Sequence, residues 1–183
     1  MAILKVAQLG HPVLRRVADP IDPEQITGPG IQQLIADMRE TMEEYDGVGL
    51  AAPQVHYSFR LVILEVGDQE MVLINPIITP LTTDMVRSYE GCLSVWKMRA
   101  AVNRWAKVRV EAYGEDGQPL DFIVEDFDAI VMQHECDHLD GVLYVDRCDT
   151  KTLAFLDEYR RWGPLDEIFE IPPGEGLTII GEE

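Results

Sequence analysis

The chain has 183 residues, of which 46% are hydrophobic, and its 33 acidic residues outnumber its 15 basic ones to give a net charge of −18. This length suits a single domain that buries about 70% of the surface of its unfolded chain, and no apolar run is long enough to span a membrane. So negative a surface repels phosphate groups, which argues against direct binding to nucleic acid or to anionic membranes.

The N-terminal part predicts a loop followed by one amphipathic helix. Residues 1–5 lack the apolar core of a signal peptide, and an odd count of three cysteines argues against a disulfide framework, so we expect a cytoplasmic protein. After a Pro/Gly-rich loop at 19–30, apolar residues recur at helical spacing over 31–45. Gly47 and Gly49 then end this helix and begin an apolar loop.

Four short segments in the middle of the chain predict strands. Residues 60–66 and 70–75 contain many β-branched or aromatic side chains, and 105–113 alternates charged with apolar residues. A Gly-Glu-Asp-Gly turn at 114–117 leads into a partner strand at 120–124. Together these segments predict antiparallel sheets.

The C-terminal part predicts a buried helix, a second helix and an acidic tail. Residues 127–139 are mostly apolar, which is typical of a helix buried on all sides. Asp149 is a suitable cap for a last helix that ends near Trp162. Residues 164–183 contain no Lys or Arg and several Gly and Pro residues, which predicts a loosely ordered acidic C-terminal tail. We therefore predict an α+β fold, with antiparallel β-sheets packed around the buried helix in one domain at 1–163.

The buried helix carries the sequence His134-Glu135-Cys136-Asp137-His138. On a helix, His134 and His138 lie one turn apart on the same face and can bind one metal ion. Glu135 points to the side, where it can act as a general base on a water molecule without binding the metal. A metal hydrolase requires this arrangement.

Two histidines leave a metal ion without a full set of ligands, so we expect a third. Cys92 is the strongest candidate, because the glycine before it lets the backbone approach another group closely. A thiolate with two imidazoles suits Fe(II), Zn, Co or Ni. His11 and His56 are expected at the surface or in turns, and Cys136 is expected to pack in the core rather than to bind metal.

Three segments resemble, in order and spacing, the signature motifs of peptide deformylases: Gly47-Val48-Gly49-Leu50-Ala51-Ala52-Pro53-Gln54, then Glu90-Gly91-Cys92-Leu93-Ser94, then Gln133-His134-Glu135-Cys136-Asp137-His138-Leu139. The resemblance covers roughly residues 5–160 and implies that the predicted domain is catalytic. The implied enzyme is a metal-dependent hydrolase that removes the formyl group from N-formylmethionine of nascent polypeptides and releases formate. This reaction is a step of N-terminal protein processing during protein biosynthesis.

The resemblance also implies a role for each residue of the site. It assigns one divalent metal ion, expected to be Fe(II) with Zn, Ni or Co as alternatives, to Cys92, His134 and His138. Glu135 is implied to take a proton from the attacking water and deliver it to the leaving amine. The side-chain amide of Gln54 and the backbone N–H of Leu93 are implied to stabilise the oxyanion.

Substrate contacts follow from the same resemblance, which assigns them to Gly47, Val48, Gly49, Ile130 and Val131. The first three offer backbone groups to an extended peptide, which binds as an added strand. The side chains of Val48 and the last two line the methionine pocket, with ordinary core packing as the alternative. An ion pair between Glu90 and Arg99 near the site is also implied.

Two features depart from the family pattern. Trp96 stands where many members have proline, which affects the rim of the pocket rather than the metal site. Some bacterial deformylases dock to the ribosome with a basic C-terminal helix, whereas this chain has no basic residue after Arg161, which argues against that contact. The expected partners are therefore formylmethionyl peptides or nascent chains, without direct binding of nucleic acid or membrane.

Two other functions are open at this point. A protease could use the same helix motif, but it needs a third ligand downstream of His138, for which Asp146 and Asp149 are the candidates. A non-catalytic relative could bind polypeptide N-termini. The presence of both Glu135 and Gln54 argues against that function, because binding alone does not need a base.

Overall fold

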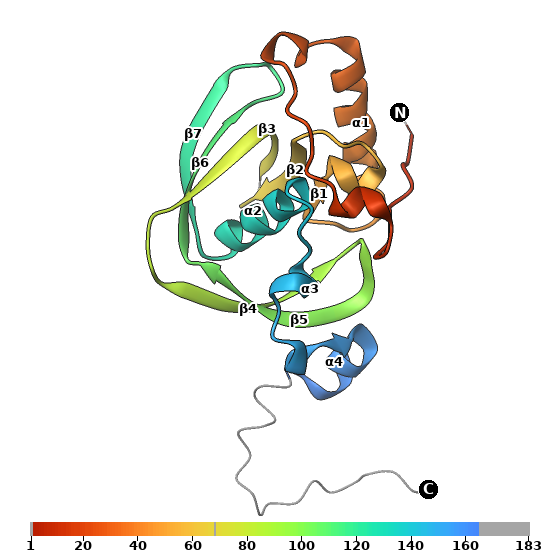
Figure 1. The fold of residues 1–183 in the computed structure, drawn as a ribbon, viewed down its shortest axis with the longest axis vertical. Coiled ribbons are helices and arrows are strands. Elements are labelled where there is room, and N and C mark those ends of the chain that lie inside the picture. Colours follow the sequence, from red (N-terminus) through yellow and green to blue (C-terminus); the bar gives the residue numbers. More distant parts are fainter. Residues whose placement is uncertain (1, 68, 165–183) are drawn as a thin grey trace, which may run out of the picture.

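Two antiparallel sheets enclose one helix, α2, in the part of the chain that the computed structural model describes, residues 2–67 and 69–164 (Figure 1). The larger sheet has the order β1-β2-β3-β6-β7, with strands Gly49–Ala51, Leu61–Val66, Gln69–Pro80, Lys107–Tyr113 and Pro119–Glu125. The smaller sheet has the order β4-β5-β8, with strands Met85–Cys92, Val95–Trp105 and Ala154–Phe155. The α-helices are α1 Pro29–Glu44, α2 Asp126–Leu139, α3 Tyr144–Arg147 and α4 Leu156–Trp162. The predicted α+β fold with antiparallel sheets around a buried helix is thus confirmed.

Strand β2 is buried on both faces and joins two layers of the core. Because successive side chains of a strand point to opposite faces, Leu61 and Ile63 belong to the hydrophobic cluster that contains α1. Val62 and Leu64 belong to the cluster that contains α2. A strand covered on both sides has a continuous apolar sequence, and the strand predicted at 60–66 is confirmed.

Helix α1 packs on one side of the larger sheet and ends just before the first motif. Its first residue, Pro29, lacks the N–H group that the first turn of a helix leaves unpaired. After the helix, Asp46 adopts the left-handed conformation with φ of 54°, which turns the chain into Gly47. The predicted apolar loop contains the short strand β1 and a 3-10 turn, Ala52–Val55, which positions the side chain of Gln54.

Helix α2 is the centre of the fold, and every residue from Ala129 to Leu139 is buried. Its first turn carries Asp126 and Asp128, whose negative charges favour the positive end of the helix dipole. A helix that is covered on all sides lacks a solvent face for its polar residues. The polar residues of the histidine motif therefore need partners inside the protein.

Strands β4 and β5 form a long hairpin that holds Cys92 beneath α2. Cys92 pairs with Val95 across a two-residue turn, and the register shifts at Gly91, which forms a β-bulge. The hairpin was not predicted, because β4 has no regular alternation of apolar and polar residues. The strand predicted at 105–113 begins two residues later, since Trp105 is the last residue of β5.

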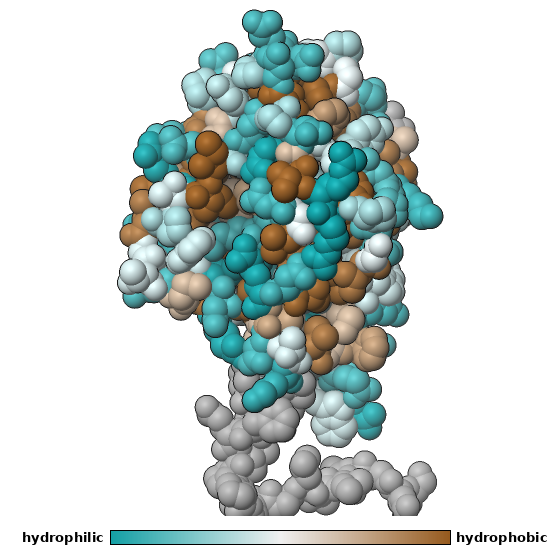
Figure 2. Space-filling model, in the orientation of Figure 1, coloured by the Kyte–Doolittle hydropathy of each residue, from teal (hydrophilic) through white to brown (hydrophobic). Residues whose placement is uncertain are grey.

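The C-terminal region differs from its prediction. Asp149 caps only a short 3-10 turn, Thr150–Thr152, and the chain then pairs with β5 as β8 before α4 begins at Leu156. The predicted acidic tail lies outside the described residues from 165 onward. Every helix in the described part is too short or too polar to span a bilayer. On the face drawn in Figure 2, hydrophobic residues form separate patches among hydrophilic ones.

Candidate metal centre

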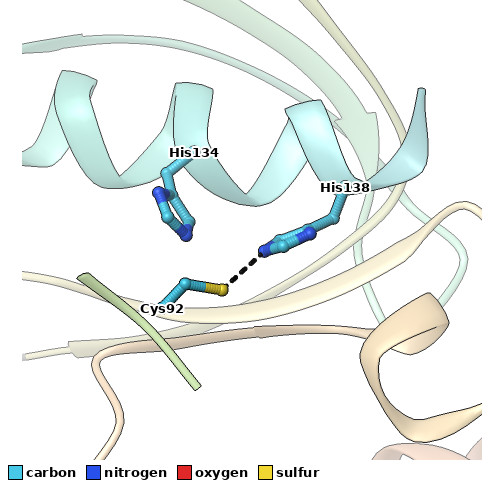
Figure 3. A group of neighbouring side chains, drawn as sticks. All are labelled: Cys92, His134 and His138. Carbon is cyan, nitrogen blue, oxygen red and sulfur yellow. Dashed lines mark hydrogen bonds between the residues drawn. The ribbon is translucent and has the colours of Figure 1, made fainter. Parts of the chain in front are cut away.

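One face of α2 and the end of β4 bring three potential metal ligands together (Figure 3). The rings of His134 and His138 are one helical turn apart, with 5.1 Å between their centroids. Sγ of Cys92 lies 3.3 Å from Nε2 of His138. One ligand atom from each of the three residues lies within 4.8 Å of the others. The structure therefore joins the three residues that the sequence nominated from two distant segments.

The ligand atoms fit a single metal ion. Metal–nitrogen and metal–sulfur bonds of about 2.0 to 2.3 Å place neighbouring atoms of a tetrahedral site about 3.5 Å apart, close to the separation of Cys92 and His138. Burial and the charge of His134 hold the pKa of His138 well below its ordinary value, so its imidazole is neutral, as a ligand must be. Burial also lowers the pKa of His134, but hydrogen bonds to Cys92 and Glu90 outweigh it and raise that pKa. A metal ion that binds here displaces a proton from this group.

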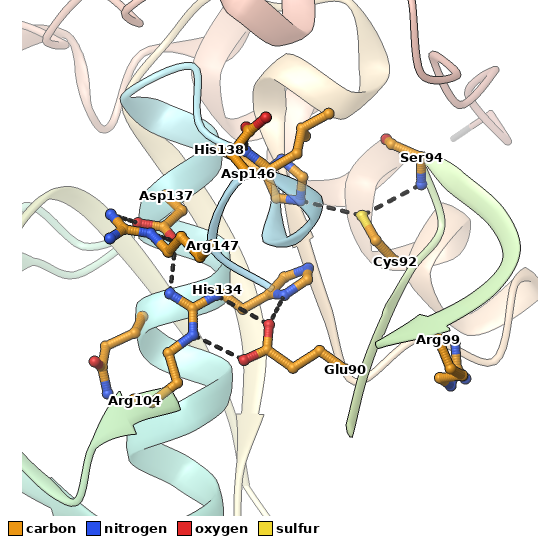
Figure 4. A network of polar contacts seen from close by, with 12 residues as sticks. Glu90, Cys92, Ser94, Arg99, Arg104, His134, Asp137, His138, Asp146 and Arg147 are labelled. Atoms are coloured by element: carbon orange, nitrogen blue, oxygen red, sulfur yellow. Dashed lines mark hydrogen bonds and ion pairs between the residues drawn. The ribbon is translucent and has the colours of Figure 1, made fainter. Parts of the chain in front are cut away.

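A buried carboxylate orients the first histidine (Figure 4). Oε2 of Glu90 lies 2.7 Å from Nδ1 of His134, which leaves Nε2 of the ring for a metal ion. Arg104 binds the same carboxylate through two hydrogen bonds of 2.8 and 2.9 Å. Burial alone raises the pKa of Glu90, but the hydrogen bonds from Arg104 and His134 outweigh it and lower the pKa to about 2. Glu90 is therefore ionised at neutral pH.

The prediction of an ion pair between Glu90 and Arg99 is wrong, because Arg104 binds the carboxylate of Glu90. Arg99 donates instead to the carbonyl of Met98 and lies directly against Gly91, where a Cβ atom would overlap its guanidinium. The sequence did contain a signal for Arg104. The alternation of β5 that buries the side chain of Val102 also buries that of Arg104.

The network extends from Arg104 to Asp137, about one turn further along α2 than His134. This carboxylate accepts hydrogen bonds from Arg104 at 2.5 Å and from Arg147 at 2.7 and 2.8 Å. Asp137 thus connects the arginine that binds Glu90 to a second arginine, from α3. Cys136 is buried, and burial raises the pKa of its thiol, which fits the predicted packing role.

Glu135 lies beside the ligands with a carboxyl group suited to proton transfer. The side chain is buried, and its Oε2 atom has no hydrogen-bond partner among the described residues. Burial raises the pKa of Glu135 from 4.5 to about 7, against the lowering effect of His134. The carboxyl lies so close to Gly49 that a Cβ atom there would overlap it. Only glycine at this position leaves room for the carboxyl group.

Gln54 reaches the same point from the opposite side. Its Oε1 atom accepts a hydrogen bond of 2.8 Å from the backbone of Ala51, which fixes the amide orientation. Its Nε2 atom then lies 3.4 Å from Sγ of Cys92 and 3.2 Å from Oγ of Ser94. Leu93, the next residue of the hairpin, lines the same cavity. The side-chain amide of Gln54 is thus held beside the sulfur of Cys92.

Two adjoining cavities open at these residues. The outer cleft, of about 470 Å³, is lined by Gly47, Val48, Gly49, Gln54, Cys92, Leu93, His134 and Glu135, and further out by residues of β5 and α4. The inner pocket, of about 210 Å³, is lined by residues of β4, β5 and α2 and by the first motif: Val48, Ser88, Tyr89, Glu90, Gly91, Arg99, Phe127, Ile130, Val131, His134 and Glu135. All five residues nominated for substrate contacts therefore lie along one of these cavities.

The residues excluded from the cluster lie elsewhere, as predicted. His11 and His56 are exposed turn residues whose rings contact each other at 4.7 Å. The two candidates for a downstream ligand have other partners. Asp146 pairs with Arg15, and Asp149 pairs with an arginine of β4. The protease alternative therefore lacks its third ligand among the described residues.

Comparisons with known proteins agree with this geometry. The sequence model of the polypeptide deformylase family matches residues 3–154. Peptide deformylase 1 of Prochlorococcus marinus is 36% identical over 180 residues, which cover 92% of this chain and 93% of that protein. Peptide deformylase of Stutzerimonas stutzeri is 44% identical over 149 residues, or 80% and 87% of the two chains. A crystal structure of class I type b peptide deformylase from Acinetobacter baumannii with Met-Ala-Ser bound superposes with a TM-score of 0.76 at 34% identity, covering 80% of this chain and 98% of that one.

Proposed function

Since the chain belongs to the polypeptide deformylase family, we propose that the cluster of Cys92, His134 and His138 is the metal centre of its active site. The chain is a metal-dependent hydrolase that removes the formyl group from nascent polypeptides. The observation that supports the proposed site best is the convergence of a thiol and two imidazoles beside a buried carboxyl group.

The site needs a Lewis acid and a base, and the chain supplies the base. A divalent ion, when bound, polarises the formyl carbonyl and lowers the pKa of water from 15.7 to about 7. Glu135 accepts a proton from the attacking water as the oxygen bonds to the formyl carbon. The same carboxyl group returns the proton to the nitrogen as the carbon–nitrogen bond breaks, which gives formate and a free amino group. A pKa of about 7 suits both transfers at neutral pH.

Gln54 and Leu93 are proposed to stabilise the oxyanion. The amide of Gln54 is held by Ala51 before any substrate binds, so no reorganisation is needed as the charge develops. The backbone N–H of Leu93, at the turn of the β4–β5 hairpin, is the second donor of this proposal. Loss of one such donor raises the barrier by about 3 kcal/mol in other enzymes.

The two cavities divide the substrate between them. The inner pocket, whose apolar side chains include Phe127, Ile130 and Val131, takes the methionine side chain. Gly47, Val48 and Gly49 pair with the peptide backbone in the outer cleft. The tripeptide bound to the relative from Acinetobacter baumannii, Met-Ala-Ser, has a methionine side chain for the inner pocket and a peptide backbone for the outer cleft.

We further propose Fe(II) as the native ion, in one catalytic domain that spans residues 1–163. Zn, Ni and Co suit the same sulfur and nitrogen ligands. The sensitivity of the enzyme activity to oxygen therefore distinguishes iron from these ions. The substrate of the proposed enzyme is made where translation occurs, so we propose that the enzyme acts in the cytoplasm. A basic C-terminal contact with the ribosome is not part of this proposal, because residues 164–183 contain no Lys or Arg.

The experiment measures formate released from formyl-Met-Ala-Ser. Protein loaded with Fe(II) under anaerobic conditions is expected to release one formate for each free amino group. Glu135→Gln, loaded in the same way, is the matched control with metal but without the base. No formate above this control would refute the assignment of the site. Exposure to air is expected to inactivate the iron form and to spare protein loaded with nickel.

A further inference from the structure

The outer cleft ends in positive charge, although the chain as a whole is strongly acidic. Its lining includes Lys97 and Arg99 from β5 and Arg160 from α4. Apart from Glu135 at the metal centre, the only carboxylate in the described lining of this cleft is that of Asp46. The chain has 33 acidic and 15 basic residues, so three cations on one cleft are a local reversal of its surface charge.

Two of these cations are available to a ligand. Lys97 and Arg160 are exposed, and neither forms an ion pair within the described residues. The ammonium of Lys97 lies 6.0 Å from the ring of Trp96, which is too long for more than a weak attraction. Arg99 differs, because it is half-buried and donates to the carbonyl of Met98.

The backbone holds Lys97 in an unfavourable conformation. Its φ angle is 56°, in the left-handed region that residues with a Cβ atom rarely adopt. Such strain persists where the surrounding structure imposes it, and it is common at ligand sites. Here it occurs at the rim of the proposed active site, one residue after Trp96, where the sequence departs from the family pattern.

Two of the three cations lie outside the inner pocket that is proposed to take the methionine side chain. The inner pocket and the outer cleft share Val48, Gly91, Arg99, His134 and Glu135, so the formylmethionine occupies their junction. Lys97 and Arg160 line the outer cleft only. An extended peptide advances about 3.3 Å per residue, so the two residues after methionine lie within reach of these long side chains.

We propose that Lys97 and Arg160 make this enzyme prefer substrates with a carboxylate side chain at one of the two residues after formylmethionine. The inference rests on the proposed function and names the class of peptide that the site favours. The guanidinium of Arg160 can bind a carboxylate through two parallel hydrogen bonds. Lys97 adds a second positive charge from the facing strand.

The test compares kcat/KM for amidated tripeptides, so that no terminal carboxylate imitates the side chain. The probes are formyl-Met-Glu-Ala-NH2, formyl-Met-Ala-Glu-NH2 and their Gln counterparts. Arg160→Gln removes one charge, and Lys97→Asn removes the other with a residue that tolerates a positive φ. Arg161→Gln is the matched control, because Arg161 stacks on Trp162 and does not line the cleft.

The loaded wild-type enzyme is expected to favour Glu over Gln at one position by roughly fivefold to tenfold at low salt, mainly through KM. Each cleft substitution should reduce that ratio roughly threefold, Arg161→Gln should leave it unchanged, and high salt should weaken it. Arg161→Gln should turn over the Gln peptides at the wild-type rate. A ratio of one in the wild type, or a ratio that neither cleft substitution alters, would overturn the charge preference. Absence of formate from every peptide would instead refute the proposed function, and this inference with it.

Discussion

Replacing Glu90 with Gln removes the carboxylate that Arg104 and His134 share in the core. The Glu90 side chain is 5% exposed and that of Arg104 is 3% exposed, so solvent screens their interaction little. A carboxyl group whose pKa falls from 4.5 to about 2 on folding contributes about 3 kcal/mol to stability at neutral pH. We therefore expect Glu90→Gln to reduce the free energy of unfolding by about 3 kcal/mol, within the range for breaking a buried ion pair.

The pH dependence gives this prediction a sign that can be checked. The folded pKa of Glu90 is lower than the unfolded one, so its contribution is complete above pH 4.5 and disappears as the pH falls toward 2. About 2 kcal/mol should be lost by pH 3. The stabilities of the wild type and of Glu90→Gln should therefore converge between pH 5 and pH 3.

Urea unfolding of metal-free protein, followed from pH 7 to the lowest pH at which it folds, measures the difference without a contribution from metal binding. Asp121→Asn is the matched control. Asp121 also receives two hydrogen bonds from an arginine, Arg109, at 2.8 and 2.6 Å, but this pair is on the surface. We expect Asp121→Asn to cause no measurable change in the free energy of unfolding. Equal losses in the two variants, or a Glu90→Gln loss that does not vary with pH, would refute the role of burial.

Three further substitutions test the chemistry of the site. Glu135→Gln should keep its metal but lower kcat by at least about a hundredfold. Wild-type turnover should fall below about pH 7 as this carboxyl group becomes protonated, and the variant should not show that fall. Gly49→Ala should reduce kcat similarly by displacing the carboxyl of Glu135, whereas Gly30→Ala, with nothing within 4 Å of the new methyl group, should have no effect. Cys92→Ala should lose bound metal in elemental analysis after dialysis, and retention of one ion per chain would point to a different third ligand.

The elements with a strong hydrophobic pattern were predicted well. The helix predicted at 31–45 and the buried helix predicted at 127–139 match α1 and α2 to within two residues at each end. The helical periodicity of α1 and the mostly apolar sequence of α2 both follow from burial, so the sequence contains the signal. The strand predicted at 70–75 belongs to a longer strand, β3, which extends to Pro80 beyond a bulge. The hydrophobic pattern does not show how far a strand continues when the outer part of the strand is exposed to solvent.

The three potential metal ligands were predicted to lie together, as they do, but the contacts that support them were not predicted. The two histidines are close in sequence, so helical spacing alone puts them on one face. Cys92 could be nominated only from its motif, because a bulge and a hairpin turn place its sulfur under α2. Arg104 was missed because an arginine in a strand is ordinarily exposed. Its alternation with Val102 was a signal for burial, but its partners Glu90 and Asp137 come from other segments of the chain.

The location of the unpaired polar atoms links stability to catalysis in this fold. Most of the buried polar side chains of α2 have protein partners: Gln133 binds the backbone of Trp105, His134 binds Glu90, and Asp137 binds two arginines. Among the described residues, Oε2 of Glu135 and Nδ1 of His138 are the atoms of this helix that do not. Each unpaired buried group costs about 1 to 3 kcal/mol. A hydrogen-bond donor from the protein beside Oε2 of Glu135 would stabilise the helix, but it would occupy the oxygen that is proposed to act as the base. In the proposed mechanism, this cost leaves a lone pair of Glu135 free to accept the proton.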